Sequence, residues 1–229
     1  MMLSVKNLVL GYNNMTLTKP FSLDISKNKW VGIIGQNGIG KSTFFKNILG
    51  LLKPVSGDIS VFGDKPGKYN SEISYIPQQR SVNLTKNMTG LSLIKNSYKG
   101  WKWGVGFKKS SLNKDILEII DLVGARDYMN QAFSTLSGGQ KKRIYLAQAL
   151  INNPKLLLLD EPLADLDPKA KQHFIKSLKL IHESRELSLL IISHDMHEIA
   201  KHLDGFIHFK DSKVHQCVNL PCIKEDVYV

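Results

Sequence analysis

Apolar residues along this chain fall into short runs whose spacing alternates between that of strands and that of helices. Residues 3–10 and the alternating residues 21–25 follow strand spacing, with a turn at residues 11–14. Residues 156–159 and 189–192 are apolar at every position, which is typical of parallel strands covered on both faces. The pattern therefore predicts an α/β fold with a mainly parallel sheet.

The remaining elements are shorter and are bounded by turn residues. Strand patterns occur at residues 30–34, 59–62, 73–76, 206–209 and 213–216, and the last two predict a hairpin. Helical spacing occurs at residues 41–52, and further helices are predicted at residues 139–152, at residues 168–185 with Pro168 in the first turn, and at residues 196–203. In a parallel sheet of this kind, ligands bind beyond the carboxyl ends of the strands.

Residues 81–135 differ from the alternating strands and helices around them. This stretch has few strand signals and several Lys, Gly and Ser residues. Residues 114–123 are amphipathic, with three isoleucines and Val123 on one side. We therefore predict a helical insertion here.

Composition agrees with one folded domain that carries a subdomain. The chain has 229 residues, of which 42% are hydrophobic and 22% are charged. Lys and Arg number 31 against 20 Asp and Glu, a net charge of +11. An anionic partner and a solvated basic surface both explain this charge, because the densest clusters, at residues 108–109 and 141–143, are short.

Cysteine usage and the length of apolar runs bear on location. Two cysteines near the C-terminus do not make a disulfide scaffold. Residues 1–14 lack an apolar core of signal-peptide length, and the longest apolar runs are too short to span a bilayer. We expect a cytosolic protein, or one that reaches a membrane only through a partner.

A glycine-rich loop follows the strand at residues 30–34 and opens the helix that comes next. The pattern G-x-x-x-x-G-K-[ST] is matched by Gly35, Gln36, Asn37, Gly38, Ile39, Gly40, Lys41 and Ser42. Glycines let backbone N–H groups curl around phosphate oxygens, and the helix N-terminus adds positive potential. Lys41 is placed for the β- and γ-phosphates and Ser42 for Mg²⁺, so the loop predicts a nucleotide site.

Two acidic residues follow the all-apolar run at residues 156–159. Asp160 is placed at a strand end to hold Mg²⁺, and Glu161 is placed to polarise an attacking water as general base. Alone, the pair reads as two solvated acids in a loop. Beside a phosphate-binding loop it predicts hydrolysis.

A second helix start rich in small residues lies later in the chain. After Leu136 it consists of Ser137, Gly138, Gly139 and Gln140. Free N–H groups at such a start favour an anion, yet by themselves these residues read as an ordinary serine N-cap. A single ATP has no evident need for two such helix starts from one chain.

These motifs occur in one order, with Pro162 after the acidic pair and Ser193, His194 and Asp195 after the second buried strand. In that order and at those separations, the chain resembles the nucleotide-binding subunit of an ABC transporter over almost its whole length. The resemblance implies a P-loop NTPase core, an N-terminal antiparallel β-subdomain and an inserted helical subdomain at about residues 81–152. It implies one ABC ATPase domain over residues 1–229 that uses ATP and Mg²⁺.

The resemblance also implies a dimer. Family ATPases associate head to tail, so Ser137 and Gly139 of one copy would bind the γ-phosphate held by the other. Asp167 matches the aspartate that touches the opposite subunit. Tyr12 matches the aromatic that stacks on adenine, although without the family it reads as a surface turn tyrosine.

Further roles follow from the same resemblance. Thr43 continues the phosphate loop, and His194 matches the switch histidine near the γ-phosphate, where the alternative is a structural histidine. Gln78 matches the glutamine that senses Mg²⁺ and links to the membrane partner, with Gln79 as the alternative register. Asp165 stands where the family usually has a small residue, which leaves the packing of that loop open.

One ATPase domain on a chain of its own resembles prokaryotic importers. Residues 98–128 and 193–197 resemble zinc/manganese uptake ATPases. Expected partners are a second copy, permease subunits and an extracytoplasmic solute-binding protein, without nucleic acid, at the cytoplasmic face of the inner membrane. The alternatives are transport of another solute, a soluble ABC-type ATPase in cofactor assembly or nucleic-acid metabolism, and a non-hydrolysing module, although no catalytic position is missing.

Four potential zinc ligands lie near the C-terminus: His208, His215, Cys217 and Cys222. A regulatory zinc site is one hypothesis for them. Their spacing matches no recognised zinc finger, so a structural role is the favoured interpretation.

Overall fold

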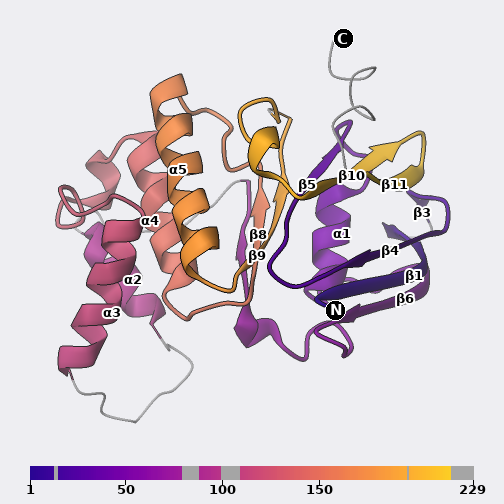
Figure 1. Ribbon diagram of the computed structural model, residues 1–229, viewed down its shortest axis with the longest axis horizontal. Coiled ribbons are helices and arrows are strands. Elements are labelled where there is room, and N and C mark those ends of the chain that lie inside the picture. Colours follow the sequence, from indigo (N-terminus) through magenta and orange to yellow (C-terminus); the bar gives the residue numbers. More distant parts are fainter. Residues whose placement is uncertain (13–14, 79–87, 99–108, 195, 218–229) are drawn as a thin grey trace.

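The computed structural model describes residues 1–12, 15–78, 88–98, 109–194 and 196–217 (Figure 1). Within these residues, six strands form the larger sheet in the order β11-β10-β5-β9-β8-β7. In chain order the strands are β5 (Trp30–Gly35), β7 (Ile73–Ile76), β8 (Leu156–Asp160), β9 (Ser188–Ile192), β10 (Gly205–Lys210) and β11 (Lys213–Cys217). Neighbouring strands are parallel except β10 and β11, which confirms the mainly parallel sheet.

The N-terminal part of the chain builds a smaller antiparallel sheet, as expected. In the described residues its order is β4-β1-β6, with β1 at Leu3–Val9, β4 at Phe21–Ile25 and β6 at Ser56–Val61. Helix α1 (Lys41–Ile48) lies between this sheet and the larger one (Figure 1). The phosphate-loop sequence therefore sits at a junction between the two sheets.

Helices cover the opposite face of the larger sheet. Helices α2 (Gly90–Ser97), α3 (Lys109–Leu122) and α4 (Gly138–Leu150) lie between β7 and β8 in the chain, which confirms the helical insertion. Helix α5 (Pro168–Ser184) connects β8 to β9. The limits of the insertion, residues 81–152, remain a prediction.

Strand β8 shows how the larger sheet is buried on both faces. Leu157 and Leu159 belong to the core shared with the inserted helices and α5, whereas Leu156 and Leu158 belong to the core shared with α1. All four side chains are fully buried. The apolar run is explained because alternate side chains enter two different cores.

Three local expectations from the sequence were wrong. Residues 196–203 form a turn and a 3₁₀ helix (Ala200–His202) rather than an α-helix, because so short a stretch closes few α-helical bonds. Helix α1 ends before residue 52, because Gly50 turns left-handed (φ 70°) and the Leu51 N–H donates to the Lys46 carbonyl.

The third correction concerns Gly11 and Tyr12, which were expected to lie in a turn at residues 11–14; residues 13–14 lie outside the described residues. Strand β2 (Gly11–Tyr12) pairs with β3 (Met15–Thr16) in a short antiparallel ribbon. Two-residue strands give no measurable alternation, so the pattern could not reveal them.

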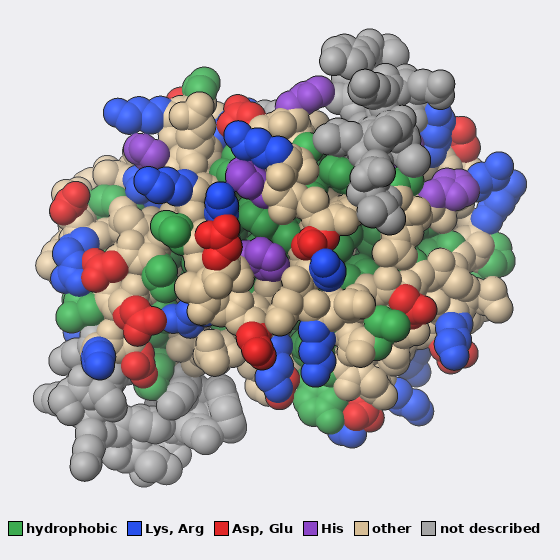
Figure 2. Space-filling model, viewed as in Figure 1, with side chains coloured by type: hydrophobic (Ala, Val, Ile, Leu, Met, Phe, Trp, Pro, Cys, Tyr) green, Lys and Arg blue, Asp and Glu red, His purple; other side chains and the backbone are tan. Residues whose placement is uncertain are grey.

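Charged side chains of both signs are mixed over the face of the molecule drawn in Figure 2. Lys29 pairs with Asp204 and Lys155 with Glu72, each at 2.8 Å. On this face, the positive charge is therefore spread over the surface rather than gathered in one patch. Among the described residues, none of the helices combines the length and apolar character that crossing a bilayer requires.

Candidate functional site

The loop between β5 and α1 has the geometry of an anion site. Gly40 is the N-cap of α1 with a φ of 113°, a backbone conformation that a residue with a Cβ rarely adopts. No side chain caps this helix start. No capping side chain therefore covers the first N–H groups of α1. These groups and the positive end of the helix dipole are available to an anion that enters the pocket.

Lys41 is a buried cation above this loop. Its side chain folds back so that Nζ donates to the carbonyl oxygens of Gly35 at 2.6 Å and Gln36 at 2.9 Å. Burial lowers the pKa of Lys41, while the negative charges of Glu161 and Asp160 act to raise it. An ammonium group in this setting is stabilised by any further anion that enters the pocket.

The two acids lie at the carboxyl end of β8, where strand pairing carries them into the pocket. The Glu161 N–H donates to the Ile192 carbonyl at 2.9 Å, so Glu161 extends the pairing of β8 with β9. Both acids are buried, and Glu161 has a φ of 49°. A left-handed backbone at a residue with a Cβ is strained, and such strain clusters at functional sites.

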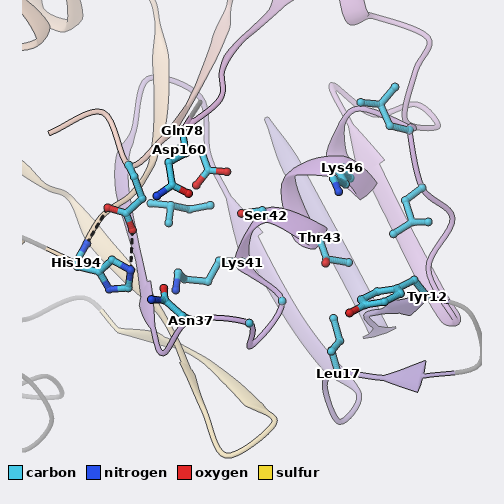
Figure 3. Close-up of a pocket in the computed structure, with 16 residues that line it drawn as sticks. Tyr12, Leu17, Asn37, Lys41, Ser42, Thr43, Lys46, Gln78, Asp160 and His194 are labelled. Carbon is cyan, nitrogen blue, oxygen red and sulfur yellow. Dashed lines mark hydrogen bonds and ion pairs between the residues drawn. The ribbon is translucent and has the colours of Figure 1, made fainter. Parts of the chain in front are cut away.

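His194 holds the Glu161 carboxylate from the neighbouring strand end (dashed lines in Figure 3). The His194 backbone N–H donates to Oε2 at 3.2 Å, and ring Nε2 lies 3.1 Å from Oε1 as a close contact without hydrogen-bond alignment. Burial raises the pKa of Glu161, and the nearby His194 and Lys41 charges act to lower it. The structure thus brings Glu161, His194 and Lys41 close together, while their roles at a nucleotide remain predictions.

Tyr75 is a member of this site that the sequence did not reveal. Its hydroxyl donates to Asp160 Oδ2 at 3.2 Å, and its ring packs edge-on against Phe45 with the centroids 6.0 Å apart. Burial raises the pKa of Tyr75, and the Asp160 charge adds to this effect. The only signal in the sequence was its position on β7, three residues before Gln78.

Lys41, Asp160, Glu161 and His194 line a pocket of about 930 Å³, and Tyr75 supports Asp160 without lining it. In Figure 3, Tyr12 and Leu17 lie at one end, Gln78, Asp160 and His194 lie at the other, and Lys41 and Ser42 lie between them. The lining residues are Tyr12, Leu17, Asn37, Gly38, Gly40, Lys41, Ser42, Thr43, Lys46, Leu51, Leu52, Gln78, Asp160, Glu161, Ile192 and His194. The lining residues that were not predicted as site residues are Leu17, Lys46, Leu51, Leu52 and Ile192, which belong to none of the motifs. The alternative register at Gln79 lies outside the described residues.

The second predicted anion site lies elsewhere. Ser137 caps α4: its Oγ accepts from the Gln140 N–H at 3.3 Å, and Gln140 Oε1 accepts from the Ser137 N–H at 2.9 Å. Asp167 caps α5 by accepting from the Ala170 N–H at 2.9 Å. In the part of the chain that the structure describes, neither residues 137–140 nor Asp167 lines the Lys41 pocket. Their roles at a nucleotide remain predictions.

The zinc hypothesis gains no support. His208 lies opposite His215 in the β10–β11 pair, and His208 is buried while His215 is exposed. No group of three or more His, Cys, Asp or Glu side chains among the described residues could hold a metal ion. Cys222 lies outside the described residues.

Comparison with known proteins identifies the class. The family described as "ABC transporter" matches residues 18–164, well over half of the chain. The chain belongs to this family, and it is an ATP-binding, ATP-hydrolysing subunit of a transporter. This agrees with the pocket, which brings a phosphate-binding loop and a buried carboxylate pair together.

Particular relatives refine this class. The chain is 33% identical to the high-affinity zinc uptake system ATP-binding protein ZnuC of Bacillus subtilis (strain 168), covering 90% of each chain. It is 31% identical to the manganese transport system ATP-binding protein MntB of the same organism, covering 88% of this chain and 80% of MntB. Relatives at 31% and 32% identity are named for an energy-coupling factor transporter and for spermidine/putrescine import.

A solved structure shows the same fold. The structure of cbiO1 from Clostridium perfringens, described as part of the ABC transporter complex cbiONQ, matches with a TM-score of 0.86. The match has 26% sequence identity and covers 99% of this chain and 92% of cbiO1. The order and packing of the two sheets and their helices are therefore those of ABC ATPase domains.

Proposed function

We propose that this chain is the ATP-hydrolysing subunit of an importer for a divalent metal ion, zinc or manganese. Two relatives with zinc uptake or manganese transport in their names support the metal. The proposed partners are a second copy, permease subunits and an extracytoplasmic solute-binding protein, with the chain at the cytoplasmic face of the membrane. Relatives named for other solutes match almost equally well, so the metal needs an experiment of its own.

The buried Lys41 at the start of α1 carries the proposed placement of ATP. Both of its hydrogen bonds go to backbone carbonyls, and phosphate oxygens would replace these carbonyls as acceptors. The phosphates would also supply the negative charge that a buried ammonium group needs. The residues from Gly35 to Thr43 would surround the phosphates. Tyr12 is 46% exposed at the far end of the pocket, where its ring would stack on adenine.

The residues beyond Lys41 fit Mg²⁺. Oxygen-bearing side chains of Ser42, Gln78 and Asp160 line this part of the pocket. Hydroxyl, amide and carboxylate oxygens suit Mg²⁺, which usually keeps several waters and binds phosphates as well. When bound, the ion supplies positive charge to the β- and γ-phosphates.

Glu161 is the proposed general base. It would accept a proton from water as the water oxygen bonds to the γ-phosphorus and the bond to the β–γ bridging oxygen breaks, with the electron pair leaving on ADP. Burial raises the pKa of Glu161, which makes the carboxylate a better proton acceptor. His194 fixes its orientation through the two contacts described above.

A second copy would complete each site. Ser137 to Gln140 and Asp167 lie outside the Lys41 pocket, and the N-terminus of α4 at Ser137 is suited to an anion. A related ATP-binding cassette, at 26% identity and a TM-score of 0.77, was solved as a dimer bound to ADP and Pi. We propose the same head-to-tail pairing, with Ser137 and Gly139 of one copy on the γ-phosphate of the other.

The hydrolytic role is tested with Glu161→Gln. The amide keeps the shape of the side chain but cannot accept the proton, so turnover should fall on the order of 100-fold or more while ATP binding is retained. Phosphate release and nucleotide binding by the purified protein measure both. Glu183→Gln, at the exposed end of α5, is the control and should match wild type. Undiminished turnover by Glu161→Gln would refute the base role.

The metal is tested by uptake. Cells that lack the chain should lose uptake of radioactive zinc or manganese and regain it with wild type but not with Glu161→Gln. Spermidine uptake is measured in parallel. Loss of spermidine uptake with metal uptake intact would contradict the metal and leave the ATPase role standing.

A further inference from the structure

Lys142 connects α4 to the turn that follows Glu161. It lies on α4 five residues after Ser137, and its Nζ donates a short hydrogen bond to the Ala164 carbonyl. The side chain is half-buried and lines a cavity of about 70 Å³ together with Gln78 and Glu161. A lysine side chain thus lines a small cavity beside Glu161 without lining the nucleotide pocket.

The charges around Lys142 explain why its head group stays there. Burial lowers the pKa of Lys142, and the carboxylates of Asp165 and Glu161 act to raise it. A desolvated ammonium is costly unless it is paired and hydrogen-bonded. The Ala164 carbonyl supplies the hydrogen bond that this head group needs, and the Asp165 and Glu161 carboxylates add negative charge nearby. Asp165, which stands where the family usually has a small residue, thus contributes to the electrostatic surroundings of Lys142.

The turn to which Lys142 is hydrogen-bonded also fixes the backbone conformation of Glu161. The Ala164 N–H donates to the Glu161 carbonyl at 3.3 Å, and the Leu166 N–H donates to the Leu163 carbonyl at 3.4 Å. Glu161 and Asp165 are both left-handed, with φ of 49° and 61°. A backbone with two such residues has few alternative conformations, so a displacement at Ala164 is transmitted to Glu161.

The N-terminal end of α4, just before Lys142, carries the predicted phosphate-docking residues. Gly139 lies against the start of α5, where an added Cβ would approach the Ala170 Cβ to 2.9 Å. Asp167 caps α5 at the end of the same turn. The start of α4, the turn at residues 161–167 and the start of α5 therefore pack as one unit, and Lys142 is a polar tie within it.

We propose that Lys142 is a positioning residue that couples phosphate docking at Ser137 to the placement of Glu161 in the same chain. The coupling rests on the proposed head-to-tail dimer. There, Ser137 serves the ATP of the second copy and Glu161 serves the ATP of its own chain. Each chain would then transmit the occupancy of one ATP site to the catalytic base of the other.

The first test compares two adjacent lysines on α4. Lys142→Met should lower kcat for ATP hydrolysis about tenfold, the rate equivalent of one hydrogen bond to a charged group. KM for ATP should not change, because Lys142 does not line the nucleotide pocket. Lys142→Arg should restore most of kcat. The control, Lys141→Met, removes a charge whose Nζ lies 5.9 Å from the centre of the Phe133 ring and should leave kcat unchanged. A wild-type kcat for Lys142→Met overturns the proposal, as does a parallel loss of kcat and ATP affinity.

A double-mutant cycle tests the coupling itself. If Ser137 and Lys142 act as one unit, Ser137→Ala with Lys142→Met should lose less kcat than the product of the single losses. If the loss of kcat in the double variant equals the product of the two single losses, the coupling is overturned. The double variant Ser137→Ala with Lys141→Met is the reference for two residues that act independently. ATP-driven dimer formation is measured separately with Glu161→Gln and with Glu161→Gln plus Lys142→Met. Both should dimerise. Absence of dimers with Glu161→Gln alone refutes the head-to-tail pairing, whereas their absence only when Lys142→Met is added refutes the positioning role.

Discussion

Asp160 is held on the side away from the pocket as well as at its strand end. The Tyr75 hydroxyl donates to Oδ2 at 3.2 Å, and the Tyr75 ring is fixed by its edge-on contact with Phe45 of α1. Outer partners of this kind orient the oxygens that a metal ion needs. The helix that carries the phosphate loop is thus connected through one aromatic ring to the proposed Mg²⁺ ligand.

Tyr75→Phe tests that connection. It keeps the ring and removes the hydroxyl, so Asp160 loses one hydrogen bond and Mg²⁺-dependent nucleotide binding should weaken about tenfold. Binding with Mg²⁺ removed by a chelator should stay at the wild-type value. Fluorescence titration of nucleotide with and without Mg²⁺ measures both.

The matched control for this change is Tyr69→Phe. The Tyr69 hydroxyl also donates to an aspartate, Asp64, at 3.1 Å, but outside the pocket. It should not affect nucleotide binding in either condition. Equal weakening of Tyr75→Phe with and without Mg²⁺ would show that Tyr75 acts on the pocket as a whole rather than on Asp160.

Residues in contiguous motifs could be predicted from the sequence, and residues that act through distant partners could not. Gly40, Lys41 and Asp160 follow from local patterns beside a strand or helix end. Tyr75 bonds a partner 85 residues away and Lys142 one 22 residues away. No periodicity relates such pairs, so only the folded chain reveals them.

At the scale of elements, α5 begins with an unusually complete set of start signals. Asp167 is the N-cap, its side chain accepts from the Ala170 N–H, and Pro168 occupies the first turn. This cap fixes the end of the turn at residues 161–167. Asp167 therefore has a role in its own chain in addition to the one proposed across the dimer.

Substitutions at Asp167 separate these two roles. Asp167→Ala should lower the free energy of unfolding by about 1 kcal/mol, the usual value of an N-cap, with a fall in Tm of about 2–4 °C. Asp167→Asn keeps a good cap and should stay near wild type in stability. Thermal unfolding of the protein without nucleotide measures both. Equal destabilisation by Asn and Ala would mean that the charge, not the cap, stabilises α5.

The elements themselves were predictable wherever burial is uniform or periodic. Strands β8 and β9 followed from all-apolar runs, and α5 from the proline at its first turn. The β2–β3 ribbon was missed because Gly11–Tyr12 and Met15–Thr16 are held by pairing rather than by an apolar pattern. Tertiary contacts also decided residues 196–203, where Met196 and Ile199 are buried without completing an α-helix.

At the scale of the whole molecule, one chain presents two separate surfaces that we propose for a nucleotide. The Lys41 pocket is one, and the start of α4 at Ser137 is the other. The motif order indicated the family, but no sequence pattern states the distance between these surfaces. Because these surfaces lie apart in one chain, a second copy would be needed to bring both kinds of surface to the same nucleotide.

Ser137→Glu tests the proposed pairing of two copies in a protein that cannot hydrolyse ATP. With Glu161→Gln and MgATP, the protein should form dimers on size-exclusion chromatography. Adding Ser137→Glu should weaken the dimer by about 100-fold or more, because like charges brought together at an interface cost several kcal/mol. Ser56→Glu, on the exposed start of β6, is the control and should dimerise normally. Dimers that persist with Ser137→Glu would rule out the γ-phosphate contact.

Lys41 has one more consequence for the working cycle. Because its ammonium group bonds the carbonyls of Gly35 and Gln36, the side chain keeps the loop in shape by standing in for the ligand that departs. The next ATP would then bind to a loop that is already ordered. Binding would exchange one set of hydrogen bonds for another instead of ordering a flexible loop. A lysine that keeps the loop ordered in this way would favour rapid binding of ATP after each round of hydrolysis.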